Sequence, residues 1–265
     1  MPESLQHYAT LVLARDGPIA TVTLNRPDKR NAISYELIGE LLRALEEIEH
    51  SAAQVLILTG AGKAFCSGMD LDNLRSITGR SEEENLADSA TMARLFRTLY
   101  EFPKVTIAAV NGAAVAGGCG LATLCDFTLA SSKAKFGYTE VRIGFVPAIV
   151  SAFLLRQVSE KHARDLLLTG RIIGAEEAFR MGLVNEVVAP EKLLGRARDL
   201  AASLLSNSPA SLLATKRLLT RYASESLDRE IAVAVEENAR IRRTADFREG
   251  VSSFLEKRNP RWTGK

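Results

Sequence analysis

Two glycine-bearing turns carry the backbone groups best suited to chemistry in this chain. Their sequences are Cys66-Ser67-Gly68-Met69-Asp70 and Ala116-Gly117-Gly118-Cys119-Gly120. Each turn follows a strand-like run and leads into a helix-like one, so its unpaired N–H groups lie at the positive end of a helix dipole. The N–H of Met69 and that of Gly117 or Gly118 are candidates for stabilising a developing negative charge, where losing one donor typically costs ~3–4 kcal/mol. The alternative is that these glycines only permit tight strand-to-helix turns.

Glu140 is the acid/base candidate. It lies a short stretch beyond the second turn, within residues 136–144. An oxyanion site and one acid/base group can move a proton next to a carbonyl, and such a group contributes ~10²–10⁴-fold in rate. The same pair is barely enough to add water, because a second carboxylate would normally share that work. The alternative for Glu140 is a surface carboxylate paired with Arg142.

Other motifs that could carry chemistry fail on spacing. Residues 60–63, Gly-Ala-Gly-Lys, lack the gap of a phosphate-binding P-loop, and Ala64 stands where that loop needs serine or threonine. Ser67 follows Phe-Cys, so it does not form a nucleophile elbow. No histidine is close to either glycine turn and no metal-ligand spacing occurs, which argues against a Cys–His dyad and a metal site.

Composition indicates an ordinary globular protein. The chain has 265 residues, 46% of them hydrophobic, and its 34 basic and 32 acidic residues give a net charge of +2. This balance gives no argument for a nucleic-acid or membrane partner. No apolar run approaches the ~18 residues of a membrane span, and the N-terminus does not resemble a signal peptide. The three cysteines are interpreted as reduced, packed thiols, which predicts a cytoplasmic protein.

Strands and helices alternate in the first part of the chain. Residues 10–15 and 19–24 alternate in polarity around Asp16-Gly17, which predicts a hairpin. A further set of elements is expected from hydrophobic periodicity: a helix from Ser34 to about residue 48, buried strands at 55–59 and 105–110, a mobile surface loop at 75–85, a helix at 86–102, a short helix ending near 124 and a strand at 127–130.

Helices dominate the later part of the chain. Short helices are expected at 148–158, 160–168 and 175–181, with a strand at 184–188. Residues 191–257 follow a helical pattern, broken near 208–209 and 223–224. The chain is therefore predicted to fold as an α/β core over residues 1–190, which holds the active site, followed by a helical region over residues 191–265.

The sequence resembles the crotonase (enoyl-CoA hydratase/isomerase) superfamily over nearly its whole length. The segments that carry the resemblance occur in the family's order: 24–27 with 31–32, 64–71, 109–120, 125–126, 136–147, 168–170 with 175–178, and 182–184. The resemblance implies a spiral of ββα units with a helical C-terminal region for trimerisation and pocket closure. It also implies a homotrimer or a dimer of trimers, and an acyl-CoA thioester as substrate with no separate cofactor.

The resemblance also implies roles for individual residues. Met69 and Gly117 match the two N–H positions of the oxyanion hole, and Glu140 matches the second catalytic glutamate of the hydratases. The first glutamate falls on Gly120 and is missing. Contacts with coenzyme A are expected from a set of residues at positions that match the family: Arg26, Ala64, Ser67, Gly68, Asp70, Leu71, Gly118 and Lys257.

Three residues in that set have more specific interpretations. Arg26 and Lys257 match positions that meet the CoA phosphates, which need a cation. The alternative is that both are solvated surface charges. Asp70 is expected to hold its turn by accepting hydrogen bonds from nearby N–H groups.

The expected activity is that of an acyl-CoA-processing lyase. Gly120 favours a Δ3,Δ2-enoyl-CoA isomerase, because moving a double bond needs only one proton shuttle. Residues 140–148 resemble methylglutaconyl-CoA-type hydratases, some of which also carry glycine at the position of Gly120, and this favours an enoyl-CoA hydratase. The alternatives are decarboxylation or thioester hydrolysis on the same oxyanion site, and a non-catalytic CoA-binding subunit.

Overall fold

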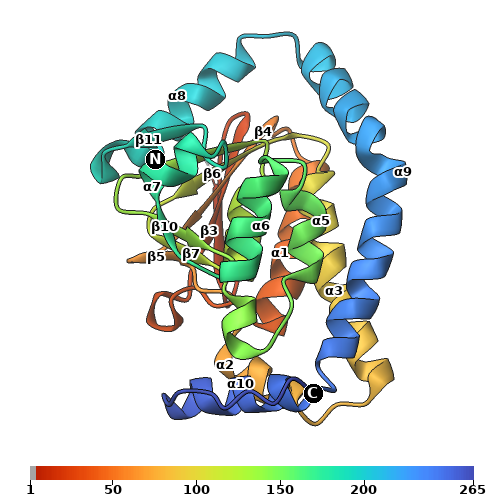
Figure 1. Ribbon diagram of the computed structural model, residues 1–265. Coiled ribbons are helices and arrows are strands. Elements are labelled where there is room, and N and C mark those ends of the chain that lie inside the picture. Colours follow the sequence, from red (N-terminus) through yellow and green to blue (C-terminus); the bar gives the residue numbers. More distant parts are fainter. Residues whose placement is uncertain (1–3) are drawn as a thin grey trace.

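The computed structural model describes residues 4–265, which form two β-sheets surrounded by helices (Figure 1). The larger sheet has the strand order β1-β2-β3-β4-β6-β8-β11. Its strands are β1 (Ser4–His7), β2 (Leu11–Asp16), β3 (Ile19–Leu24), β4 (Val55–Gly60), β6 (Val105–Val110), β8 (Phe127–Ser131) and β11 (Glu186–Val188). The first three strands pair antiparallel, and the pairing is parallel from β3 onward.

The smaller sheet has the order β10-β9-β7-β5. Its strands are β5 (Ala64–Cys66), β7 (Ala113–Val115), β9 (Lys135–Gly137) and β10 (Ile173–Gly174). Each of β4, β6 and β8 in the larger sheet is followed in the chain by a strand of the smaller one, and then by a helical turn or helix. This order is the predicted succession of ββα units.

The predicted hairpin is confirmed. Strands β2 and β3 pair from Leu11 opposite Leu24 to Asp16 opposite Ile19. Gly17 adopts a φ of 53° in the connection, a conformation that glycine reaches without a steric cost.

Both faces of the larger sheet are covered, which explains why its central strands are hydrophobic without alternation. Val55 and Ile57 of β4 face α8 (Leu193–Leu205), whereas Leu56 and Leu58 face the main core. Successive side chains of a strand point to opposite faces, so one apolar run serves two cores.

The helices of the core are α1 to α7, and the chain also forms three short 3₁₀ turns before α8. The α-helices are α1 (Tyr35–Glu49), α2 (Leu71–Ile77), α3 (Glu82–Tyr100), α4 (Gly117–Thr123), α5 (Ala148–Leu154), α6 (Glu160–Thr169) and α7 (Ala175–Arg180). The 3₁₀ turns are η1 (Pro27–Lys29), η2 (Glu140–Ile143) and η3 (Pro190–Lys192). Ser34 caps α1 as predicted, because its Oγ accepts a hydrogen bond from the Leu37 N–H at 3.2 Å.

The loop predicted over residues 75–85 is confirmed only for residues 78–81. Helix α2 continues to Ile77 and α3 begins at Glu82. The Ser81 Oγ accepts from the Glu84 N–H at 3.2 Å, and the Glu84 carboxylate accepts from the Ser81 N–H at 2.7 Å. This reciprocal capping box starts the helix inside a stretch whose polarity suggested a loop.

The C-terminal region consists of α8, α9 (Pro209–Ile241) and α10 (Ala245–Glu256). The predicted break at Ser208-Pro209 is confirmed, since Ser208 caps α9. The predicted break near residues 223–224 is wrong, because α9 runs through it without interruption. The Ser224 Oγ donates to the Arg221 carbonyl oxygen one turn earlier, a local bond that a helix accommodates.

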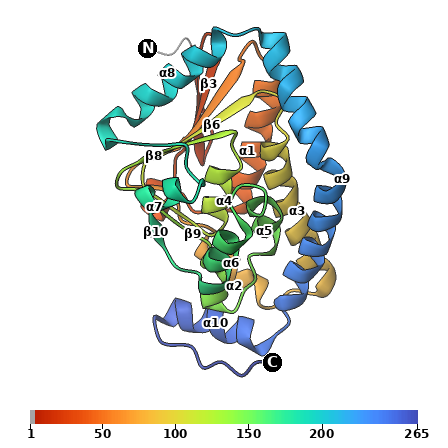
Figure 2. The same ribbon diagram turned by 45° about the horizontal axis from the view of Figure 1, so that its top comes forward.

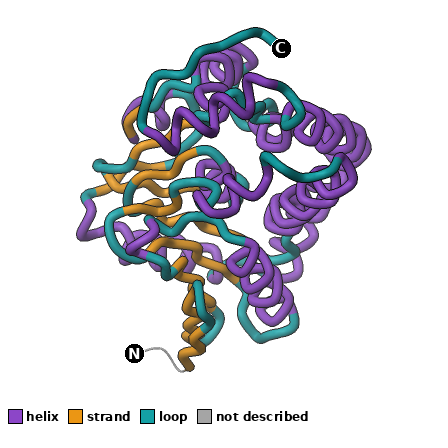
Figure 3. Tube along the Cα trace, turned by 90° about the horizontal axis from the view of Figure 1, so that it is seen from below, coloured by secondary structure: helices purple, strands orange, loops and turns teal. Residues whose placement is uncertain are grey.

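The long helix α9 lies alongside α3 and α5 and leads down to α10, which crosses the lower end of the molecule (Figures 1 and 2). Seen from below, the strands lie together toward the left, and most of the helices lie to their right and above them (Figure 3). A cavity opens at the lower end, between α2, α3, α9 and α10.

Candidate active site

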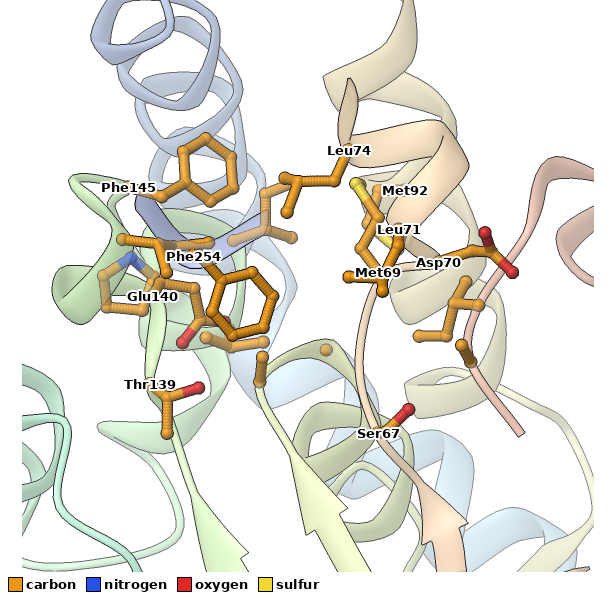
Figure 4. A pocket seen from close by; sticks show the side chains of 18 of the residues that line it. Ser67, Met69, Asp70, Leu71, Leu74, Met92, Thr139, Glu140, Phe145 and Phe254 are labelled. Carbon is orange, nitrogen blue, oxygen red and sulfur yellow. The ribbon is translucent and has the colours of Figure 1, made fainter. Parts of the chain in front are cut away.

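A cavity of about 610 Å³ brings both predicted turns and Glu140 together. Figure 4 shows Glu140 and Phe254 on one side of it and Met69, Leu71 and Met92 on the other. The volume is in the range of pockets that enclose a small organic ligand, which typically measure ~300–1,000 Å³. Among the residues predicted to act in catalysis or to contact CoA, those that line it are Ser67, Met69, Asp70, Leu71, Gly117, Glu140 and Lys257.

The two glycine turns are in direct contact. A Cβ atom added to Gly118 would lie 2.3 Å from the Cys66 carbonyl oxygen, and one added to Gly68 would lie 3.0 Å from the Ala116 Cβ. Gly68 also has a φ of 86°, which disfavours any side chain. Gly68 and Gly118 therefore let two backbones approach, and neither lines the cavity; the buried Ala64 does not line it either.

The Met69 N–H is free to bind a ligand. The neighbouring groups are engaged, because the Ile33 N–H donates to the Gly68 carbonyl at 2.8 Å and the Asp70 N–H donates to the Ile33 carbonyl at 2.9 Å. These two bonds form a parallel β-bridge between Ile33 and Met69. In this arrangement Met69 directs its own N–H away from Ile33. Within residues 4–265 no acceptor is bonded to the Met69 N–H.

The Gly117 N–H is available for a different reason. Gly117 is the first residue of α4, where helix geometry leaves the N–H without an intrahelical acceptor. The preceding residue, Ala116, has φ 52° and ψ −127°, a strained conformation for a residue with a Cβ. The Ala116 N–H donates to the Gly137 carbonyl oxygen at 2.7 Å, which fixes this strained residue at the cavity wall. The strain at Ala116 could not be predicted from the sequence, since only its backbone angles distinguish it.

Glu140 begins η2 and is 8% exposed. Its Oε2 is buried without a hydrogen-bond partner in the described part of the chain. Loss of solvation raises the pKa of this carboxyl from 4.5 to about 7. The alternative of a surface carboxylate paired with Arg142 is wrong, because Glu140 is buried and forms no ion pair with any described residue. A carboxyl with a pKa near neutrality can both take and return a proton.

The position of Gly120 is closed by apolar side chains. A Cβ atom added there would lie 2.9 Å from Val150 Cγ1 and 3.2 Å from Phe96 Cζ. A glutamate at this position would therefore need both side chains to move. The side chains of Val150 and Phe96 occupy the space that a second carboxylate at this position would need.

Asp70 holds the first turn, as predicted. Its Oδ1 accepts from the Asp72 N–H at 3.0 Å at the start of α2, and its Oδ2 lies 2.8 Å from an Arg26 guanidinium nitrogen. The Arg26 guanidinium also donates to the Ala32 carbonyl oxygen at 2.6 Å and does not line the cavity. In this structure Arg26 joins the early loop to the first turn, so a direct contact with CoA phosphates would require it to leave both partners.

Cations gather at another part of the cavity wall. Lys257 caps α10 in a left-handed conformation with φ 55°, and its exposed side chain lines the cavity. Lys29 and Arg30, in the loop after β3, are also exposed and line it. Sequence reasoning missed these two because a Lys-Arg pair in a turn is typical of any surface loop.

The cysteines are packed as predicted. Cys66, Cys119 and Cys125 are unpaired and buried. Burial raises the pKa of each thiol to about 12, so none is a reactive thiolate at neutral pH. The described residues contain no group of three or more histidine, cysteine, aspartate or glutamate side chains that could hold a metal ion. None of the helices in residues 4–265 is both long and apolar enough to span a membrane.

Comparison with known proteins agrees with this geometry. Residues 14–265 match the family model for enoyl-CoA hydratase/isomerase. The chain belongs to this family, which is the crotonase superfamily indicated by its sequence, and its fold is the crotonase-like spiral with a helical C-terminal region. It is accordingly an enzyme of the hydratase/isomerase type.

Individual relatives cover almost the full chain. A Thermus thermophilus protein whose name provisionally assigns it as an enoyl-CoA hydratase is 46% identical over 95% of this chain and 100% of its own length. The 1,2-epoxyphenylacetyl-CoA isomerase of Escherichia coli is 34% identical over 93% of this chain and 95% of its own. The crystal structure of an enoyl-CoA hydratase from Mycobacterium avium is 34% identical, covers 97% of this chain and 100% of its own, and superimposes with a TM-score of 0.86.

Proposed function

We propose that the protein hydrates 2-enoyl-CoA thioesters, with the Met69 and Gly117 N–H groups binding the thioester oxygen and Glu140 transferring the proton. The observation that carries the proposal is the buried Glu140 carboxyl without a partner, which lines the same cavity as two unpaired N–H groups. A carboxyl is kept in such surroundings at a cost to stability, and perturbed groups of this kind concentrate at functional sites.

The chemistry follows from these groups. Glu140 takes a proton from a water molecule as the water oxygen bonds to C3 of the enoyl thioester, and the electron pair of the double bond moves to the thioester oxygen. The Met69 and Gly117 N–H groups bind this enolate oxygen. Glu140 then returns a proton to C2, so one water molecule has been added and the carboxylate is regenerated. Stabilisation of charge that develops only in the transition state is the step that raises the rate.

Double-bond isomerisation is the second candidate, and one observation favours it. Phe96 and Val150 fill the space at Gly120, so no second carboxylate is present there to position water. In that reaction Glu140 would take the proton from C2 of a 3-enoyl thioester and return it to C4. The Escherichia coli relative is named as an isomerase of an epoxide, so its name gives no direct support for moving a double bond. The majority of the relatives' names favour hydration.

The test is to give one purified sample both substrates. Mass spectrometry of the products of a 2-enoyl-CoA and a 3-enoyl-CoA distinguishes a gain of one water from a shift of the double bond. Glu140→Gln keeps the size of the side chain and should lower turnover at least ~100-fold. Near-full activity of this variant would reject Glu140 as the acid/base group. Tight binding of the thioester by the wild-type protein without any turnover would favour a non-catalytic CoA-binding subunit.

The binding of coenzyme A is proposed to use the exposed cations of the cavity wall. Lys257, Lys29 and Arg30 present charges that phosphate groups require. Ser67 and Leu71 line the same cavity and are proposed to contact the CoA thioester. The CoA thioester is itself the substrate, so no separate cofactor is proposed.

A homotrimer or a dimer of trimers is proposed for the assembly. Helix α9 exposes large apolar side chains, with Leu219 63%, Tyr222 75% and Val233 62% exposed. Such surfaces are typical of protein contacts. A cytoplasmic location is proposed from the three unpaired cysteines, since reducing compartments keep thiols free.

A further inference from the structure

Asn238 of α9 is a buried polar residue that lines the cavity and has no role in the proposed chemistry. It is 5% exposed. Its Oδ1 accepts two hydrogen bonds, from the Ser89 hydroxyl at 2.8 Å and from an Arg242 guanidinium nitrogen at 2.7 Å. A guanidinium can only donate, so the atom that faces Arg242 must be the amide oxygen. The orientation of the amide is thereby fixed.

The amide nitrogen of Asn238 is left with two hydrogens to donate. No acceptor in residues 4–265 bonds to it, and it is not among the polar atoms sealed from solvent. Because the residue lines the cavity, the space that this nitrogen can reach is the cavity itself.

The position of Asn238 along the cavity follows from its contact with α3. Ser89, Met92 and Phe96 are spaced by three and four residues, so they lie on one face of that helix. Phe96 stands next to the oxyanion turn, because a Cβ added to Gly117 would lie 3.6 Å from its Cζ. Seven residues of helix separate Phe96 from Ser89, which is about 10 Å. Asn238 therefore lies well away from the oxyanion turn, and we take the cavity around it to receive the far end of the acyl group.

The surroundings of Asn238 carry an excess of positive charge. Arg242 lies 2.6 Å from Asp88, whose other oxygen is 3.1 Å from Arg80, so two cations share one anion. Arg242 is buried and its Nε has no hydrogen-bond partner in the described chain. Its guanidinium also lies 5.4 Å from the centre of the Phe145 ring, which lines the cavity. An anion at this end of the cavity would balance the excess positive charge.

We propose that Asn238 selects acyl groups whose far end carries a carboxylate, which accepts a hydrogen bond from the Asn238 amide nitrogen. The inference rests on the proposed action on enoyl-CoA thioesters and specifies their acyl group. An acyl chain that ends in methyl would displace water from this nitrogen and give it no acceptor in return. Sites built to donate to a polar substrate atom reject analogues that lack it for this reason.

The test compares two trans-2-enoyl-CoA thioesters of equal length, one ending in a carboxylate and the other in an alkyl group of the same shape. The wild-type protein should show a kcat/KM at least ~10-fold higher for the carboxylate form. In Asn238→Asp one oxygen still accepts from Ser89 and Arg242, whereas the donor becomes a negatively charged acceptor. This variant should lower the ratio of the two kcat/KM values at least ~10-fold.

The matched control is Asn85→Asp. Asn85 accepts from the same Arg242 guanidinium at 3.3 Å and is buried, but it does not line the cavity. The Asn85→Asp substitution places the same new charge beside Arg242 without altering the amide that faces the substrate. The ratio of the two kcat/KM values should therefore stay within about twofold of wild type. The absence of a wild-type preference for the carboxylate form, an unchanged ratio in Asn238→Asp, or an equal fall in Asn85→Asp would each overturn the inference. The comparison of the two thioesters on the wild-type protein does not depend on any variant folding. If the wild-type protein hydrates the alkyl form and shows no preference for the carboxylate form, the inference fails and the proposed hydratase activity stands.

Discussion

Replacing Glu140 by glutamine should remove activity. It should also make the protein more stable relative to wild type at high pH than at low pH. The carboxyl has a folded-state pKa of about 7, above its ordinary value of 4.5, because burial disfavours the charged form. A raised carboxyl pKa means that the folded protein holds the proton more tightly than the unfolded chain. The contribution of this carboxyl to the free energy of unfolding of the wild-type protein is therefore present at low pH. It is lost as pH rises from about 4.5 to about 7.

The magnitude follows from the shift. A difference between 4.5 and about 7, at about 1.4 kcal/mol per pKa unit, corresponds to about 3 kcal/mol. Between about pH 5 and pH 8 the wild-type protein should lose about 2–3 kcal/mol relative to Glu140→Gln, which cannot ionise. Any constant cost of burying the amide is the same at both pH values, so it cancels from this comparison.

The measurement is urea unfolding of both proteins at the two pH values, at one protein concentration because the protein is proposed to be an oligomer. Glu191→Gln is the matched control, since Glu191 is exposed and forms no ion pair with a described residue. Its free energy of unfolding should follow that of wild type at both pH values. A pH-dependent difference below about 1 kcal/mol for Glu140→Gln, or one of opposite sign, would show that the carboxyl is not held in the desolvated state described here.

Further changes test the remaining parts of the site. The wild-type kcat/KM for hydration should rise with pH and level off above about 7, because in the proposed mechanism the carboxylate form of Glu140 accepts the proton from water; a profile that is flat through this range would contradict that role. Gly117→Pro removes one N–H donor and should lower kcat at least ~100-fold, with the melting temperature reporting whether the fold is kept; unchanged kinetics would make the turn purely architectural. Gly120→Glu should destabilise the protein by about 1–3 kcal/mol through overpacking against Val150 and Phe96, measured by urea unfolding, and wild-type stability would refute the described packing. Lys257→Ala should raise KM for a CoA thioester more than for the matching pantetheine thioester, which lacks the nucleotide phosphates; equal effects on both would place the lysine outside phosphate binding.

The parts of the fold that could be predicted are those in which local pattern and burial agree. The central strands β4 and β6 are continuous apolar runs, and Ser34 marks the start of α1. The two failures are also local. The stretch after Ser81 is polar enough to suggest a loop, yet a capping box makes it the beginning of α3. Residues 223–224 suggested a helix break, yet packing of α9 against α3 and α5 carries the helix through.

The site could be predicted only where chemistry depends on residue type. Glu140 and the glycine turns are visible in the sequence, and the structure places them at one cavity. The strain at Ala116 is a backbone property and leaves no mark on residue identity. Asn238 lies about a hundred residues beyond Glu140, and its free donor is evident only once Arg242 and Ser89 are seen to occupy its oxygen.

Glycine at position 120 leaves Glu140 without a neighbouring carboxylate from that position, and this bears on the raised pKa of Glu140. Phe96 and Val150 occupy the space at Gly120, and the wall they form is apolar. A second carboxylate placed nearby would add like-charge repulsion to the burial that already acts on Glu140, and one of the two would then stay protonated well above neutrality. With apolar groups in its place, desolvation is the cause that raises the pKa of Glu140, and it does so only to about 7. A single carboxyl with this pKa exchanges protons readily near neutral pH, so a one-glutamate site is chemically consistent without the second group.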